Sequence, residues 1–174
     1  STEKKELNSI FTPDGKEFYF TIRGADNKWT IMVMKKKKNR WSKPEIAPFS
    51  GKYSDVDLYI SPDGEKLYFC SNRPLLGEGE PSSNMDIWVM ERVKGEWGKP
   101  KNLGLPLNSH RWELYPSVTN DGTIYFQTER PDSKGGRDIY LSRPEGGRHR
   151  EIVNAGDVLN SEFDEISRFI NYTP

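Results

Sequence analysis

The chain has 174 residues, enough for one or at most two ordinary domains, and its 26 basic and 26 acidic side chains give a net charge of zero. This balance argues against nucleic acid or an anionic membrane as the main partner, because both select for a basic surplus or a basic patch. The single cysteine, Cys70, excludes an internal disulfide and a cysteine-based zinc site, and no apolar stretch approaches the roughly 20 residues of a membrane-spanning helix.

The rest of the composition favours strands and turns. Only 33% of the residues are hydrophobic, yet 12% are aromatic, and the chain contains 15 glycines and 12 prolines. Aromatic side chains are enriched in strands, whereas glycine and proline mark turns. The apolar runs alternate or continue over about five residues, which is typical of strands, and we find no amphipathic helix pattern. The chain is therefore predicted to be all-β.

The first part of the chain carries a set of landmarks that recurs later. They are an acid, a Pro-Asp-Gly phrase, an apolar-Tyr-Phe triplet, a second apolar stretch, a tryptophan and a closing phrase: Glu6, 13–15, 18–20, 30–34, Trp41 and 48–50. Proline presets φ, aspartate bonds to its own backbone and glycine adopts a positive φ, so Pro-Asp-Gly predicts a tight turn between two strands.

The same landmarks return about 50 residues later, at Asp55, 62–64, 67–69, 86–90, Trp97 and 106–108. Four strands can be placed in this unit, at 58–61, 66–70, 86–90 and 97–103, with the first strand following the acid. Both faces of the strand at 66–70 are apolar or aromatic, whereas a sheet exposed on one side alternates cleanly. Both faces of this sheet are therefore predicted to be covered.

A third set of landmarks follows, at Glu113, 121–122, 124–126, 138–142, His149 and 158–160. Glu165 then stands where a fourth unit would begin. We expect repeats at about 6–54, 55–112 and 113–164, with a partial repeat at 165–174.

Units of this length with several short strands predict a β-propeller or a related array. In a propeller each blade is a four-stranded antiparallel sheet that is covered by its two neighbours. The predicted fold is therefore an all-β propeller, with about three blades and the first strand of a fourth in residues 1–174. Because propellers have about 4–8 blades, we expect the chain to be a fragment of a larger propeller rather than part of a ring that is shared between chains.

The phrase SPDGEKLYF at 61–69, followed by DIWVM at 86–90, resembles the WD40-like repeats with a Pro-Asp-Gly turn. These repeats occur in TolB-like propellers and other bacterial envelope proteins, and TPDGKEFYF at 12–20 and NDGTIYF at 120–126 are similar copies. The resemblance implies a periplasmic or extracellular protein. The first copy departs from the pattern at Thr30, which replaces the aspartate that begins the third strand.

An acid begins the innermost strand of each unit, and two more acids lie nearby: Glu6, Asp55, Glu113 and Glu165, with Asp57 and Asp164 beside them. A ring of carboxylates at the channel mouth would bind a cation, a basic peptide or sugar hydroxyls. We favour the simpler interpretation, in which each acid accepts hydrogen bonds from its neighbours and fixes the register of the strands. The acid repeats in every unit, whereas a catalytic residue need occur only once.

Two arginines and one histidine are further candidates. Arg73 and Arg130 follow the second strands, and Asp86 and Asp138 begin the third strands, so we expect structural arginine–aspartate pairs across these hairpins. His110 lies near the predicted channel entrance, but one histidine with scattered acids is weak support for a metal site. No phosphate-binding glycine loop and no nucleophile elbow is present, so we predict no cofactor, no metal and no catalytic residue.

The leading hypothesis is a non-enzymatic binding or scaffolding propeller of the bacterial cell envelope, as the resemblance implies. It would recognise a protein or glycan ligand through its loops and channel mouth, with no nucleic acid partner and no membrane span. The candidate contact residues are Asp55, Asp57, Tyr59, Arg73, Glu113, Tyr115 and Glu165.

Two alternatives stay open. A carbohydrate-active propeller predicts two carboxylates that face one cleft, with exposed aromatic side chains such as Trp112 as platforms for sugar rings. The propeller domain of a prolyl-oligopeptidase-type peptidase predicts a separate hydrolase domain beyond residue 174. The first alternative places the chemistry in this chain, whereas the second does not.

Overall fold

The computed structural model describes residues 6–165, which form strands joined by turns and loops, with no helix in that range and hence none that could cross a membrane. The strands are β1 (Glu6–Phe11), β2 (Glu17–Arg23), β3 (Trp29–Lys37), β4 (Arg40–Trp41), β5 (Glu45–Ile46), β6 (Asp55–Ile60), β7 (Lys66–Ser71), β8 (Asp86–Val93), β9 (Glu96–Trp97), β10 (Lys101–Asn102), β11 (Leu114–Val118), β12 (Ile124–Thr128), β13 (Asp138–Ser142), β14 (Pro144–Glu145), β15 (Arg148–His149) and β16 (Val153–Asn154).

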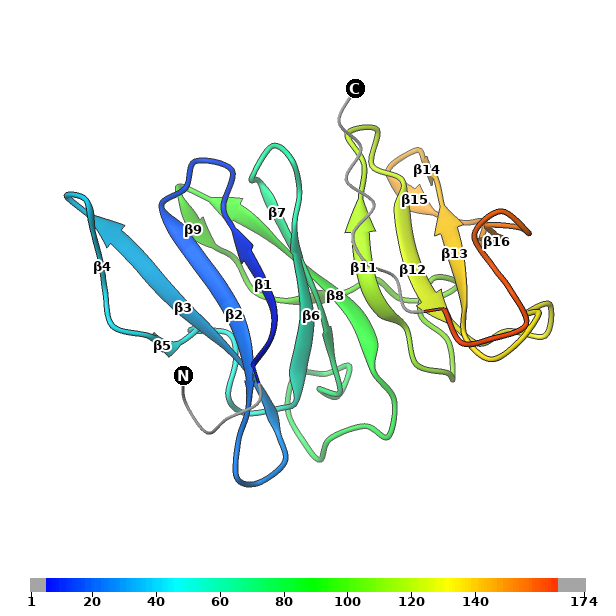
Figure 1. The fold of residues 1–174 in the computed structure, drawn as a ribbon, viewed down its shortest axis with the longest axis horizontal. Helices are drawn as coiled ribbons and strands as arrows, with labels where there is room; N and C mark the ends of the chain where they lie inside the picture. The colour runs from blue at the N-terminus through cyan, green and yellow to red at the C-terminus, as the bar shows by residue number, and fades with distance from the viewer. Residues whose placement is uncertain (1–5, 166–174) are drawn as a thin grey trace.

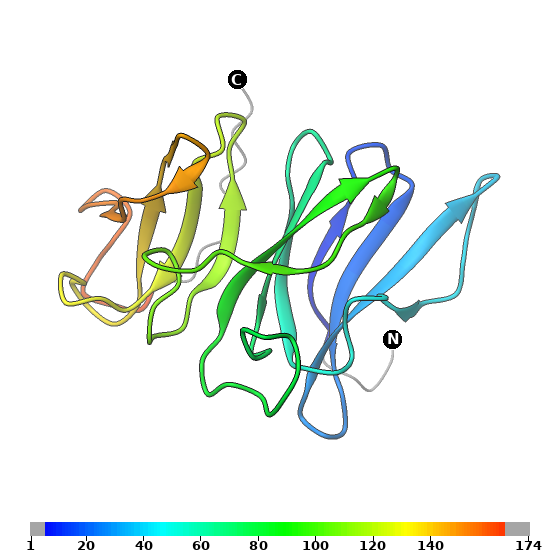
Figure 2. The same cartoon turned by 180° about the vertical axis from the view of Figure 1, so that it is seen from behind.

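These strands form three antiparallel sheets and one separate hairpin. The first sheet contains β1 to β5, the second β6 to β10, and the third β11, β12, β13 and β16, while β14 pairs with β15. The sheets stand side by side, and their first strands, β1, β6 and β11, lie next to one another (Figures 1 and 2). The β2–β3, β7–β8 and β12–β13 loops therefore share one edge of the molecule, which we call the loop edge.

The Asp-Gly phrases form the predicted turns at the opposite edge. Asp63 Oδ1 accepts hydrogen bonds from Ser61 Oγ at 2.5 Å and from the backbone N–H of Glu65 at 3.0 Å, and the other two turns contain the same pair of bonds. The glycine of each turn has a φ of 65°, 74° or 84°, a region that glycine adopts without steric cost: Gly15, Gly64 and Gly122. Local chemistry thus fixes the first hairpin of every sheet.

Two of the strand predictions are corrected by the structure. The strand expected to follow the acid at 58–61 begins at the acid itself, because β6 starts at Asp55. The single outer strand expected at 97–103 is divided into β9 and β10, which pair with different parts of β8. Pro100 lies between these two short strands and has no N–H to donate to the ladder.

The second sheet is buried on both faces, which confirms the prediction from its sequence. Phe69 packs in a cluster with Tyr19 and Ile31 of the first sheet, whereas Tyr68 and Cys70 belong to a second cluster, shared with the third sheet. Successive side chains of a strand point to opposite faces, so one strand contributes to two cores. Each aromatic ring buries a large apolar area between the sheets.

The outer face of the first sheet carries a partly exposed aromatic cluster, which we call the open face: Phe11, Phe18, Phe20 and Trp41. The ring centroids of Phe11 and Phe18 are 4.5 Å apart, and Phe11 is 55% exposed. In the repeat, Phe20 occupies the position of Phe69, which is fully buried against the first sheet. The open face therefore has the composition of a buried sheet interface.

Candidate functional site

Asp55 is completely buried at the start of β6. Its carboxylate accepts hydrogen bonds from Ser50 Oγ at 2.8 Å and from Ser71 Oγ at 2.6 Å, and Arg73 Nη2 lies 2.7 Å from Oδ1. Arg73 also donates to the carbonyl oxygen of Phe49 at 3.0 Å. We call this arrangement the acid clasp, because it ties the incoming connection and the end of β7 to the start of β6.

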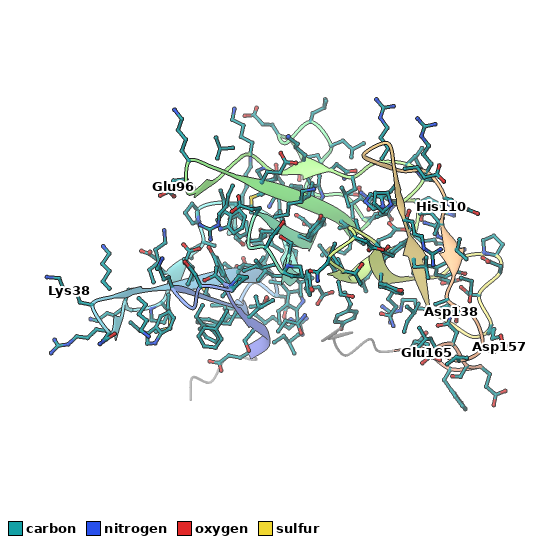
Figure 3. The ribbon with its side chains drawn as sticks, turned by 90° about the horizontal axis from the view of Figure 1, so that it is seen from above. Lys38, Glu96, His110, Asp138, Asp157 and Glu165 are labelled. Carbon is teal, nitrogen blue, oxygen red and sulfur yellow. The ribbon has the colours of Figure 1, made fainter. Side chains whose placement is uncertain are left out.

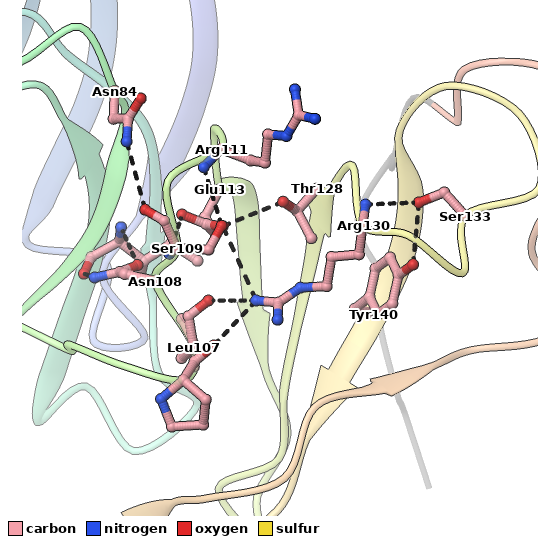
Figure 4. Close-up of polar contacts among 12 residues, drawn as sticks. Asn84, Leu107, Asn108, Ser109, Arg111, Glu113, Thr128, Arg130, Ser133 and Tyr140 are labelled. Carbon is pink, nitrogen blue, oxygen red and sulfur yellow. Dashed lines mark hydrogen bonds and ion pairs between the residues drawn. The ribbon is translucent and has the colours of Figure 1, made fainter.

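The third sheet repeats the acid clasp around Glu113 (Figure 4). Glu113 Oε1 accepts hydrogen bonds from Ser109 Oγ at 2.5 Å and Thr128 Oγ1 at 3.2 Å, and the Ser109 N–H donates to Oε2 at 3.1 Å. Arg130 Nη2 lies 4.0 Å from Glu113 Oε1 and donates to the Leu107 carbonyl oxygen at 2.8 Å. Burial raises the pKa of Glu113, while these hydrogen bonds act in the opposite direction.

Glu165 begins the same contact again at the end of the described chain. The N–H and Oγ of Ser161 both donate to Glu165 Oε1 at 2.6 Å, and the Glu165 N–H donates to the Arg137 carbonyl oxygen at 2.9 Å. The rest of the predicted partial repeat, 166–174, lies outside the described residues.

Asp57 lies at an irregular position that recurs in the first strand of every sheet. The pairing with the second strand shifts register there in all three sheets, and Asn8, Asp57 and Tyr115 have φ values of 38°, 53° and 51°. A positive φ is uncommon for residues other than glycine, and most unusual for a bulky one such as tyrosine. A bulge of this kind redirects a side chain, here toward the adjacent first strand.

Asp57 consequently connects three sheets. Asn8 Nδ2 from β1 donates to Asp57 Oδ1 at 2.7 Å, and the Tyr115 N–H from β11 donates to Oδ2 at 3.3 Å. Burial raises the pKa of Asp57 to about 7, although both hydrogen bonds favour the ionised form. Tyr59 adds a further link, because its hydroxyl donates to the Val118 carbonyl oxygen at 3.0 Å.

The two predicted arginine–aspartate pairs, Arg73–Asp86 and Arg130–Asp138, are replaced by other partners. Asp86 accepts a hydrogen bond from Asn102 Nδ2 at 2.8 Å, and the equivalent bond joins Asn154 to Asp138. Both arginines instead reach inward to the acid clasp. In both sheets, the aspartate that was predicted to pair with an arginine is therefore bound by an asparagine of the outer strand.

The closing phrases have a role that the sequence did not reveal. Asn108 Oδ1 accepts the Ile87 N–H at 2.8 Å, while its Nδ2 donates to the Ile87 carbonyl oxygen at 3.0 Å and to Asn102 Oδ1 at 2.8 Å. Asn160 makes the same three bonds in the third sheet. This asparagine clasp fastens the third strand to the connection that follows it. The recurring Leu-Asn in two units was the one signal of it in the sequence.

A pocket of about 390 Å³ opens at the loop edge, and we call it the loop-edge pocket. Its lining comes from the β7–β8 loop, the β10–β11 connection and the β12–β13 loop: Asn84, His110, Arg111, Trp112, Glu129 and Arg137. His110 lies at the third-sheet end of the molecule, far from Lys38 on the first sheet (Figure 3). The seven predicted contact residues lie outside this lining, but it contains two other residues named from the sequence, His110 and Trp112.

The pocket combines one indole with several polar groups. Trp112 is 50% exposed, and its Nε1 donates to the Ser83 carbonyl oxygen at 3.0 Å. Arg111 Nη2 lies 3.8 Å from Glu129 Oε1. Among residues 6–165, no group of three or more His, Cys, Asp and Glu side chains is placed to hold a metal ion. The arrangement suits recognition by hydrogen bonding, charge and ring stacking.

The sheets and their order define an all-β fold of antiparallel sheets that stand side by side, which is similar to the fold of TolB-like propellers. It is similar to TolB from Acinetobacter baumannii, with 18% identity and a TM-score of 0.57, and to a puromycin-hydrolyzing peptidase from Mycobacterium tuberculosis, with 14% identity and a TM-score of 0.59. Each match covers 88% of this chain, but only 33% of the TolB chain and 22% of the peptidase chain. No protein-family model and no curated protein matches the chain. At these identities, the likeness concerns the fold.

Proposed function

We propose that this chain is a non-enzymatic binding module in a propeller of the bacterial cell envelope, and that it recognises a protein or glycan ligand through its loop edge. The observation that carries the proposal is the loop-edge pocket, where three loop segments bring together polar side chains and an indole held by Ser83. Pockets with a few convergent polar groups are the usual places for ligands. The envelope location, periplasmic or extracellular, rests on the resemblance to TolB-like repeats.

We assign six of the seven predicted contact residues, all except Glu165, to the rigid support of this pocket. Glu113 directly follows Trp112 and is fixed by the acid clasp, while Asp55 and Arg73 form the same clasp in the second sheet. Asp57, Tyr59 and Tyr115 connect the first strands of neighbouring sheets. A ligand site on a preorganised frame loses less conformational entropy on binding.

We also infer that further sheets complete the ring. The open face repeats the composition of the face that the second sheet buries against the first. Sheets supplied by the same polypeptide would make residues 1–174 a fragment of a larger propeller, which is the arrangement we favour over a ring shared between two copies.

The likeness to the puromycin-hydrolyzing peptidase favours a second candidate, the propeller domain of a prolyl-oligopeptidase-type peptidase. In that case a separate hydrolase domain would carry out the chemistry. The carbohydrate-active alternative receives less support, because it needs two carboxylates that face one cleft, and the pocket lining contains one, Glu129.

An array experiment tests the proposed function. Labelled protein is applied to immobilised glycans and peptides, together with the variants Trp112→Ala in the pocket and Trp41→Ala on the open face. Binding that Trp112→Ala loses and Trp41→Ala retains would support the binding module. Equal signals from all three proteins, or release of a cleaved product from a bound ligand, would overturn it.

A further inference from the structure

The two arginines of the loop-edge pocket differ from the buried arginine of the acid clasp in the second sheet. Arg73 is 8% exposed and lies 2.7 Å from its carboxylate partner. Arg111 and Arg137 line the loop-edge pocket, are 51% and 37% exposed, and lie 3.8 and 3.7 Å from their carboxylate partners. Exposed pairs at such distances contribute little to stability. Both pocket guanidinium groups can therefore exchange their present partner for an anionic ligand.

Trp112 offers a surface of a different kind to the same ligand. The bond from its Nε1 to the Ser83 carbonyl oxygen satisfies the indole N–H and fixes the ring, which remains half-exposed. The ring therefore presents an apolar face with no hydrogen-bonding group of its own to satisfy. A sugar ring also has an apolar face of C–H groups, and its hydroxyls would meet Asn84 and Glu129 in the same lining.

The charges of the lining limit how anionic the ligand is. In the lining, Arg111 and Arg137 carry two positive charges and Glu129 carries one negative charge. Asp164, which lies outside the lining, pairs with Arg137. A single ligand carboxylate that replaces Asp164 as the partner of Arg137 balances the charges of the lining, and its planar shape matches the guanidinium fork. A phosphate group carries a charge of about −1.5 to −2 and would place the extra negative charge beside Glu129.

The geometry points to a sugar ring that carries one carboxylate, as in a uronic acid residue of an acidic glycan, as the ligand of the loop-edge pocket. This inference rests on the proposed binding function and commits it to one ligand class. Trp112 stacks on the ring, Arg111 and Arg137 bind the carboxylate, and Asn84 and Glu129 bind the hydroxyls.

Titration with matched trisaccharides tests the ligand class. The probes are trigalacturonate and its carboxyl-reduced, neutral counterpart, and the readouts are calorimetry and tryptophan fluorescence at low salt. We expect trigalacturonate to bind at least about tenfold more tightly than the neutral probe. Arg111→Gln and Arg137→Gln should each reduce the affinity for trigalacturonate by about tenfold, whereas the exposed control Arg150→Gln should leave this affinity unchanged.

The outcomes separate this inference from the proposed function. Equal affinity for both trisaccharides, unchanged affinity in both pocket arginine variants, or tighter binding of a phosphorylated trisaccharide would each overturn the ligand class. In any of these cases, the proposed binding function would still be supported if the array identifies other ligands whose binding requires Trp112. Equal urea midpoints for the variants and the parent chain show that the losses of affinity do not come from unfolding.

Discussion

Asp57 is the residue whose environment predicts a dependence of stability on pH. Its ordinary pKa is 3.8, and burial raises the pKa to about 7 in the folded chain. Between these values the folded state holds a proton that the unfolded state has lost. The contribution of Asp57 to the free energy of unfolding is therefore greatest below pH 4 and declines as the pH rises to about 7, by up to about 4 kcal/mol.

Urea unfolding of the parent chain and of Asp57→Asn, measured in steps from pH 4 to pH 8, isolates this contribution. The asparagine does not titrate, so the difference in free energy of unfolding between the two proteins should change across this window in favour of the variant. Other buried carboxyl groups, such as Glu113, titrate in both proteins, so their contributions cancel in the difference between the two free energies of unfolding. A difference that stays constant with pH would show that Asp57 is ionised in the folded chain.

The acid clasp makes a second prediction at the scale of single residues. Arg73→Met leaves the buried carboxylate of Asp55 without its cation, and we expect a loss of about 3–5 kcal/mol in the free energy of unfolding. The exposed control Arg150→Met should change it by less than about 0.5 kcal/mol. The double variant Asp55→Asn/Arg73→Met should lose less than the sum of the two single variants, and strict additivity would argue against direct coupling.

At the scale of single strands, the asparagine clasp should control the stability of β8. Asn108→Ala removes three hydrogen bonds and leaves the buried N–H and carbonyl of Ile87 without these partners, so we expect a loss of about 2–4 kcal/mol. Amide hydrogen exchange of Ile87 should accelerate more than that of Leu67, which lies in the middle of the same sheet. Equal acceleration at both amides would indicate global unfolding rather than local opening of β8.

Features of the strands could be predicted from the sequence where they depend on residues close together in the chain. The Asp-Gly turns and the two-sided burial of β7 follow from turn chemistry and alternation, and both are present. The bulge at Asp57 was not predictable, because its bonds to Asn8 and Tyr115 join residues that are 49 and 58 positions apart in sequence. The division of the outer strand had a local signal in Pro100, but the sequence did not show that its two parts pair with different parts of β8.

The candidate site was predictable only in part, for a reason that concerns the whole molecule. The repeated acids were chosen as candidates because a repeat can be recognised in a sequence. In the structure, these acids hold strands and connections together. The loop-edge pocket combines residues that occur once, such as Asn84 and Arg137, from loops that differ between units. Only the packing of the second sheet beside the third brings these loops together. Recurring residues therefore build the frame, and variable loops build the surface available to a ligand.

The open face leads to a prediction for the molecule as a whole. An exposed aromatic cluster that repeats a buried interface should bind another apolar surface. We expect the isolated chain to self-associate, with a mass in sedimentation that rises with concentration. The variant Phe11→Lys/Trp41→Lys should remain monomeric with little change in the free energy of unfolding, because both side chains are exposed. The loop control Leu76→Lys should associate like the parent chain.

By contrast, Phe69→Ala, at the buried position equivalent to Phe20, should lose about 3–5 kcal/mol in the free energy of unfolding. A parent chain that stays monomeric at every concentration would mean that the open face needs no covering sheet.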